Sequence, residues 1–367
     1  MSFKCGIVGL PNVGKSTLFN ALTNSNKAQA ENFPFCTIDP NIGIVNVPDF
    51  RLDKLAKISK SKKKINTTIS FVDIAGLVKG ASKGEGLGNK FLSHIREVDA
   101  IIHMIRCFDS DDIQNVNKNV DPIRDLEIIE TEMMLADLES IQKRLDKKNK
   151  KNLDDDEQKL LETVLDYINN NKNLNDLLGK FDKKKLNTSG LLCTKPKIFV
   201  CNIDEKSINK GNKYTETFIN KFGSKNTIVI SAEIENQINQ LEKEEKENYM
   251  KMIELKETGI NVLIKKGYDI LTLQTFFTSG LEETRAWTIP KECVAPEAAG
   301  KIHSDFEKGF IRAETVSYDD FIKNEGWTNS KANGKMRLEG KDYIVKDGDI
   351  LNFRFNTWPY FFHTKVS

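Results

Sequence analysis

The sequence predicts an α/β protein in which buried strands alternate with helices, followed by a small α+β domain. Three observations support this prediction. Short apolar runs are separated by helical stretches in the first part of the chain. From Asp121 to Leu186, apolar residues recur every three or four positions, as is typical of helices. From Thr284 onward, strand-like runs and glycine turns replace that pattern.

The first element in chain order is a strand, a glycine loop and a helix start. Residues 4–8 are apolar, residues 9–16 read G-L-P-N-V-G-K-S, and residues 17–22 open a helix. This is the phosphate-binding loop motif, in which loop N–H groups and the helix N-terminus face a phosphate. We expect Lys15 to contact the β- and γ-phosphate oxygens and the Ser16 hydroxyl to bind Mg²⁺.

Two later segments are expected to complete this site. Residues 32–40 have no helical period, so we expect either a switch loop in which Thr37 binds Mg²⁺ or a plain surface loop. Residues 68–72 form a buried strand that runs into a D-x-x-G motif. We expect Asp73 to hold Mg²⁺ through water and the Gly76 N–H to contact the γ-phosphate.

The base-reading segment follows the strand predicted at residues 197–201. Guanine-specific proteins carry N-K-x-D here, and its Asp accepts hydrogen bonds from guanine N1 and N2. This chain has N-I-D-E, in which Ile203 replaces the Lys and the longer Glu205 replaces the Asp. Because adenine has an acceptor at N1 and a donor at N6, the sequence argues against strict guanine selection and favours adenine. After the next strand, Ser231 begins an S-A motif that we expect near the base.

Several residues bear on how water would be activated. Leu77 follows Gly76, where signalling GTPases have a Gln that orients water, so that route is absent. His103 lies inside an apolar run and is expected to be a core residue. His94 is expected to be structural.

Composition excludes several classes of protein. The 367 residues carry a net charge of +2, so the chain as a whole is not a polycation. Its six cysteines contain no C-x-x-C pair, which argues against a zinc site or a disulfide framework. No apolar run approaches the roughly 20 residues needed to span a bilayer. We expect a cytoplasmic monomer with no membrane partner.

The long helical stretch suggests an inserted antiparallel hairpin. Its basic turn, residues 147–152, either contacts phosphates or is simply solvated.

Five motifs are shared with one known family: G-L-P-N-V-G-K-S-T, N-F-P-F-C-T, D-I-A-G-L-V-K-G-A-S-K-G-E-G-L-G-N, N-I-D-E and H-S-D-F-E-K-G-F-I-R-A. In this combination the chain resembles the YchF family, the Obg-like ATPases. The resemblance implies an Obg-type P-loop NTPase domain at residues 1–122 and 194–283 and an inserted α-helical coiled-coil hairpin at 123–193. It also implies a C-terminal α+β TGS (ubiquitin-like) domain at 284–367.

The resemblance further implies ATP binding with slow, Mg²⁺-dependent hydrolysis, and association with ribosomes. It places metal contacts on Ser16 and Thr37 and a base contact on Ile203. The full predicted nucleotide-binding set is Asn12, Val13, Gly14, Lys15, Ser16, Thr17, Asn202, Ile203, Glu205 and Ser231. In one departure, Asn115 stands where relatives commonly have a His proposed to assist hydrolysis.

We therefore predict a Mg²⁺-dependent ATPase that acts as a translation or stress regulator on the ribosome or ribosomal RNA. Lys15 and Gly76 are the predicted catalytic groups, and Ser16, Thr37 and Asp73 are the predicted metal set. ATP is expected to bind more tightly than GTP, and K⁺ near Asn12 is a candidate additional cation. Two alternatives remain open: a GTPase of the same fold, and a ribosome- or RNA-binding adaptor with negligible turnover.

Overall fold

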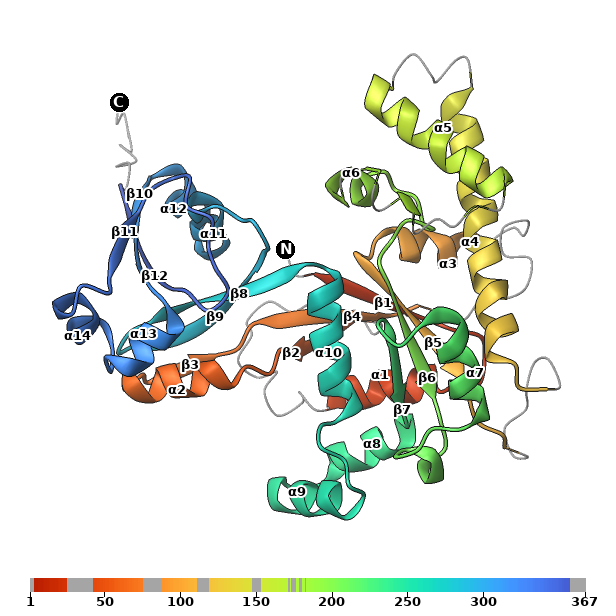
Figure 1. The fold of residues 1–367 in the computed structure, drawn as a ribbon, viewed down its shortest axis with the longest axis horizontal. Helices are drawn as coiled ribbons and strands as arrows, with labels where there is room; N and C mark the ends of the chain where they lie inside the picture. Colours follow the sequence, from red (N-terminus) through yellow and green to blue (C-terminus); the bar gives the residue numbers. More distant parts are fainter. Residues whose placement is uncertain are drawn as a thin grey trace, which may run out of the picture. The chain divides into compact units, whose positions relative to one another are not determined.

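The computed structural model describes residues 3–24, 42–74, 87–110, 119–146, 153–170, 172, 176–177, 180–181 and 183–356. The chain divides into two compact units (Figure 1). The first consists of Met1–Val45 and Ile69–Ile270, and the second of Asn46–Thr68 and Leu271–Ser367. Within the described residues, no helix is both long enough and apolar enough to cross a membrane.

The first unit has the predicted α/β architecture, in which the described strands form a six-stranded sheet that is combined with helices. Its strands run in the order β2-β4-β1-β5-β6-β7. They are β1 (Lys4–Val8), β2 (Ile42–Asn46), β4 (Thr68–Asp73), β5 (Ala100–Arg106), β6 (Lys197–Asn202) and β7 (Thr227–Ile230). Its helices are α1 (Lys15–Asn24), α3 (Leu87–Arg96), α4 (Pro122–Leu145), α5 (Asp155–Asn169), α6 (Lys183–Thr188), α7 (Lys213–Phe222), α8 (Ala232–Gln240), α9 (Lys243–Met252) and α10 (Gly259–Ile270).

The strands β4, β1, β5, β6 and β7 pair in parallel. Ile7 of β1 is in register with Asp73 of β4 on one side and with Ile102 of β5 on the other. Farther along the sheet, Asn202 of β6 is in register with Ile230 of β7. The carboxyl ends of these strands therefore lie along one edge, which is where ligands bind in open α/β sheets.

Apolar packing on one face of this sheet joins it to two helices. Cys201 of β6 packs in one buried cluster with Phe218 of α7 and Leu126 of α4. Strand β5 is buried along its whole length. These buried central strands carry the loops at their carboxyl ends.

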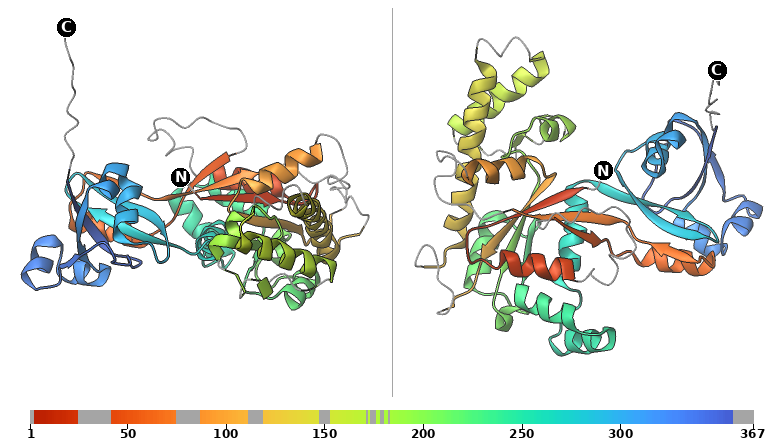
Figure 2. Two further views of the ribbon diagram at one scale, coloured as in Figure 1. Left: turned by 90° about the horizontal axis from the view of Figure 1, so that it is seen from above. Right: turned by 180° about the vertical axis from the view of Figure 1, so that it is seen from behind.

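The helical insertion consists mainly of α4 and α5, which lie side by side (Figure 2). The chain starts α4 with Asp121, whose carboxylate accepts hydrogen bonds from the N–H groups of Ile123 and Arg124. Ile141 of α4 packs against Leu161 of α5 in a buried cluster of its own. Two packed helices are found where a hairpin was predicted; its assignment as a coiled coil stays a prediction, and the basic turn at 147–152 lies outside the described residues.

The second unit is α+β, as predicted. Its sheet runs in the order β11-β10-β12-β8-β9-β3. The strands are β3 (Lys63–Ile65), β8 (Leu273–Ser279), β9 (Glu283–Pro290), β10 (Phe310–Val316), β11 (Arg337–Glu339) and β12 (Ile350–Phe355). The helices are α2 (Phe50–Ile58), α11 (Ala295–Ile302), α12 (Ser304–Lys308), α13 (Tyr318–Lys323) and α14 (Trp327–Ala332).

Both faces of this second sheet are covered. Phe277 of β8 packs in one cluster with Leu55 of α2 and Phe321 of α13. Its neighbour Phe276 points to the opposite face and packs with Ala298 of α11. Two apolar layers therefore sandwich the sheet.

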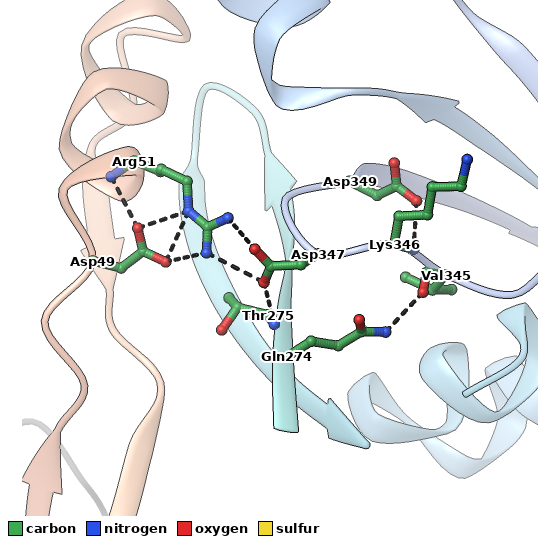
Figure 3. A network of polar contacts seen from close by, with 8 residues as sticks. All are labelled: Asp49, Arg51, Gln274, Thr275, Val345, Lys346, Asp347 and Asp349. Atoms are coloured by element: carbon green, nitrogen blue, oxygen red, sulfur yellow. Dashed lines mark hydrogen bonds and ion pairs between the residues drawn. The ribbon is translucent and has the colours of Figure 1, made fainter. Parts of the chain in front are cut away.

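An ionic network ties residues 46–68 into the second unit (Figure 3). The Arg51 guanidinium, at the start of α2, donates hydrogen bonds to Asp49 and to Asp347, with N···O distances of 2.9 Å and 2.6 Å. Asp347 also accepts a hydrogen bond of 3.0 Å from the Thr275 N–H of β8. Burial alone would lower the pKa of Arg51, but its hydrogen bonds to the two carboxylates raise it above its ordinary value.

This arrangement differs from the predicted domain boundaries in two places. The division predicted between 283 and 284 falls at the hairpin of β8 and β9, which pair along their whole length. In addition, β3 pairs with β9, so residues 46–68 join the second sheet although they lie within the predicted span 1–122. Both differences arise from strand pairing: the first within a local hairpin and the second between segments far apart in sequence. The TGS assignment stays a prediction.

Candidate functional site

The phosphate-binding loop leads from β1 into α1 at the carboxyl edge of the first sheet. Asn12 and Gly14 have φ angles of 65° and 92°, which lie in the left-handed region that Asn and Gly tolerate best. A Cβ atom on Gly14 would come within 2.3 Å of the Asn202 amide nitrogen, and one on Gly9 within 2.8 Å of the Met104 carbonyl. Close contacts therefore favour glycine at both positions of the motif, and the left-handed turn favours it at Gly14 as well.

The Lys15 ammonium lies 2.6 Å from a carboxylate oxygen of Asp73, at the end of β4. Both side chains are largely withdrawn from solvent, with exposed fractions of 12% and 20%. This contact brings together two residues that the sequence placed in one site. It also directs the Asp73 carboxylate toward the loop, where a metal bound to phosphate would need it.

The remaining loop residues differ in exposure. Val13 is buried, Thr17 is half-buried, and Ser16 and Asn12 are exposed. Ser16 lies in the first turn of α1, next to Lys15. Its hydroxyl is therefore accessible to a ligand at the helix N-terminus.

Asn202 joins the loop to the base-reading edge of the sheet. Its amide nitrogen donates to the Val13 carbonyl at 2.9 Å, and its amide oxygen accepts from the Ala232 N–H at 3.0 Å. The residue is only 5% exposed. The side chain thus fixes two backbone segments relative to each other.

Two other members of the base-reading segment, and Ser231 of the S-A motif, have distinct local roles. Ile203 is buried in the cluster with Phe218, so its side chain contributes to the core. Asp204 accepts a hydrogen bond of 2.9 Å from the Ser207 N–H and caps the 3₁₀ helix Glu205–Ser207. Ser231 is buried, and its hydroxyl caps α8 by accepting from the Ile234 N–H.

Glu205 is the exposed carboxylate of the base-reading segment. Its Oε1 atom accepts a hydrogen bond of 2.7 Å from the amide nitrogen of Gln237 in α8. The amide oxygen of Gln237 in turn accepts from the Tyr249 hydroxyl of α9 at 2.8 Å. No motif marks Gln237 in the sequence, because it lies in a polar helix.

The prediction that His103 is a core residue is confirmed. The ring is fully buried, and its Nε2 atom lies 3.0 Å from a carboxylate oxygen of Glu130 in α4. Glu130 also forms an ion pair with Lys197 of β6. Burial alone would raise the pKa of Glu130, but Lys197 and His103 together lower it to about 2.

Four residues of the predicted mechanism, Thr37, Gly76, Leu77 and Asn115, lie outside the described residues. The metal role of Thr37 and the catalytic role of Gly76 therefore stay predictions.

Comparison with known proteins gives consistent matches. A family model described as "50S ribosome-binding GTPase" matches residues 4–203, and one described as "Protein of unknown function (DUF933)" matches residues 273–356. The chain is 50% identical over 364 residues to "Ribosome-binding ATPase YchF" of Escherichia coli O157:H7, covering 97% of this chain and 100% of that protein. It is 48% identical over 366 residues to the protein of that name from Bacillus subtilis, with the same coverage.

Solved structures agree with these matches. The structure of the Schizosaccharomyces pombe YchF GTPase has a TM-score of 0.85 and 37% identity, covering 96% of this chain and 98% of that one. A GTP binding protein from Pyrococcus horikoshii has a TM-score of 0.60 and 19% identity, which shows a shared fold.

Proposed function

The chain belongs to the YchF family, and from this premise we propose that it is a Mg²⁺-dependent ATPase that acts as a nucleotide-controlled switch on the ribosome. The observation that carries this proposal is the convergence of Lys15, Asp73 and Asn202 at one edge of the sheet. The glycine loop provides backbone N–H groups there, and the exposed Glu205 lies in the segment that would read the base.

The chemistry proposed for the loop is phosphoryl transfer to water. Lys15 would exchange its contact with Asp73 for the β- and γ-phosphate oxygens and stabilise the charge that develops on them. Asp73 and Ser16, together with Thr37, would hold Mg²⁺, which supplies positive charge to the same oxygens. The donors fit this metal, since Mg²⁺ prefers oxygen and needs only one or two protein carboxylates beside phosphates and water.

Hydrolysis is proposed to be slow without a partner. Leu77 and Asn115 cannot act as a general base at neutral pH. Water would then be positioned by backbone groups such as the Gly76 N–H, or by an incoming partner. K⁺ at Asn12 is a further candidate source of charge near the leaving group.

The relatives are described both as ATPases and as a GTPase, and base selection depends on the residues of this chain. Ile203 is buried and Asp204 caps a helix, which leaves Glu205 as the carboxylate able to meet a base. A clamp for guanine needs a carboxylate that accepts from N1–H and N2–H together. Adenine requires a single acceptor for N6, and we propose that ATP binds more tightly than GTP.

Competition binding tests this selection. ATP and GTP would be titrated into the Mg²⁺-loaded chain and into Glu205→Asp, which restores the shorter side chain of guanine readers. We expect wild type to favour ATP and the variant to lose part of that preference. A clear GTP preference in wild type would instead support the alternative, a GTPase of the same fold.

Ribosome binding is proposed from the described relatives, which are named ribosome-binding. Co-sedimentation with ribosomes in the presence of a non-hydrolysable ATP analogue or ADP tests whether nucleotide controls the association. Equal binding in both states and negligible turnover would favour the alternative of an adaptor. A ribosome partner also fits a cytoplasmic location, and we propose that the chain acts as a monomer.

A further inference from the structure

Gln237 is held at both ends of its carboxamide. The Tyr249 hydroxyl donates to the amide oxygen at 2.8 Å, and the amide nitrogen donates to Glu205 Oε1 at 2.7 Å. Because the Glu205 carboxylate accepts and does not donate, the NH₂ end of the amide faces it, and the carbonyl end then takes the Tyr249 hydroxyl hydrogen. Three elements meet here: the 3₁₀ helix after β6, α8 and α9.

This contact changes what Glu205 can offer to a ligand. A free carboxylate presents two oxygens, and guanine uses both, one for N1–H and one for N2–H. With a donor already on Oε1, that oxygen has one lone pair left for a ligand, whereas Oε2 stays free of this contact. Paired capture of guanine N1–H and N2–H is therefore weakened, while Oε2 still matches the single N6 amine of adenine. The Gln237 nitrogen also carries a second N–H, the kind of donor that adenine N1 accepts and guanine N1–H opposes.

We propose that Gln237 is a specificity-determining residue that biases the base site toward adenine by hydrogen-bonding one oxygen of Glu205 and so weakening its paired acceptance from guanine. Tyr249 is the positioning residue that orients the amide. This inference rests on the proposed function, because it places the nucleotide base beside Glu205. It adds a second side chain to base selection, contributed by a helix outside the N-I-D-E motif.

The test is the ratio of ATP to GTP affinity, measured by calorimetry on the full chain with Mg²⁺. Gln237→Leu keeps the size of the side chain but frees Glu205 Oε1. We expect it to lower the ATP:GTP affinity ratio about tenfold, mainly by strengthening GTP binding. Tyr249→Phe removes one hydroxyl and should lower the ratio about threefold.

Gln240→Leu is the matched control, because Gln240 is an exposed glutamine of the same helix. It should leave the ratio unchanged. Suppose that wild type prefers ATP. If Gln237→Leu then keeps the wild-type ATP:GTP affinity ratio, or loses affinity for both nucleotides equally, this inference is overturned and the proposed function stands. If wild type itself shows no preference for ATP, the proposed base selection fails and this inference fails with it. Tyr249→Phe provides the same test should the leucine variant fail to fold.

Discussion

The amide nitrogen of Asn202 donates to the carbonyl of Val13, and one side chain thereby connects the base-reading edge of the sheet to the phosphate-binding loop. The two residues are 189 positions apart in the chain. The other end of the same amide holds the Ala232 N–H at the start of α8. One side chain thus joins the phosphate-binding loop to the segment predicted to read the base.

Asn202→Ala should weaken both recognition and stability. It leaves the Val13 carbonyl and the Ala232 N–H without their buried partner, which costs about 1–3 kcal/mol. We expect ATP affinity to fall more than tenfold and the unfolding temperature to drop. Asn209→Ala is the control, because Asn209 is exposed. Calorimetry measures the ATP affinity, and thermal unfolding measures the stability. Wild-type ATP affinity in Asn202→Ala would contradict the inference that Asn202 holds the phosphate-binding loop in its binding conformation.

Asp73→Asn separates metal binding from phosphate binding. The neutral amide is a poorer ligand for Mg²⁺, so the Mg²⁺ concentration for half-maximal hydrolysis should rise at least about tenfold. Nucleotide binding in EDTA should be kept or strengthened, because Lys15 loses its carboxylate partner. Asp269→Asn, at an exposed position in α10, should change neither quantity. An unchanged Mg²⁺ requirement in Asp73→Asn would remove Asp73 from the metal set.

Some parts of the fold and of the candidate site are encoded in short stretches of sequence, and others depend on long-range contacts. The loop at Gly14 and Lys15 and the strand end at Asp73 follow from short motifs and apolar runs, so the sequence predicts them. The pairing of β3 with β9 depends on contacts across more than half the chain, and no local pattern reports it. The role of Gln237 depends likewise on a contact 32 residues away, in a helix whose polar sequence is compatible with a solvated surface.

Arg51→Met should destabilise the second unit. The substitution leaves Asp49, which is 10% exposed, and Asp347 without their shared cation. We expect a loss of about 1–3 kcal/mol in the free energy of unfolding, with ATP affinity unchanged. Lys62→Met is the control, because Lys62 and its partner Glu282 are 70% and 79% exposed and such pairs contribute about 0–1 kcal/mol. Denaturant titration should separate the two variants; equal effects would mean that the Arg51 network contributes nothing specific.

Glu130 should make stability depend on pH in the acid range. Its pKa falls from an ordinary 4.5 to about 2 on folding, so the ionised carboxylate stabilises the fold above about pH 4.5. That contribution is lost as pH falls from 4.5 toward 2. Glu130→Gln should lower the free energy of unfolding by on the order of 2 kcal/mol at pH 7. The difference in the free energy of unfolding between this variant and wild type should become smaller below pH 4.5. Glu139→Gln removes a solvent-exposed ion pair with Lys143 on the same helix, which also lowers the pKa of Glu139, so both its effect on stability and the pH dependence of that effect should be much smaller. A pH-independent difference between Glu130→Gln and wild type would contradict this prediction.

Phosphate release from ATP, measured with and without added ribosomes for wild type and Lys15→Ala, is the sharpest test of the proposed ribosome-dependent ATPase activity. We predict turnover below ~1 s⁻¹ for wild type alone, a clear increase with ribosomes, and background release for Lys15→Ala in both conditions. Asn115→His would show in the same assay whether that position can activate water. ATP hydrolysis that is unaffected by Lys15→Ala, or wild-type release no faster than background even with ribosomes, would contradict the account.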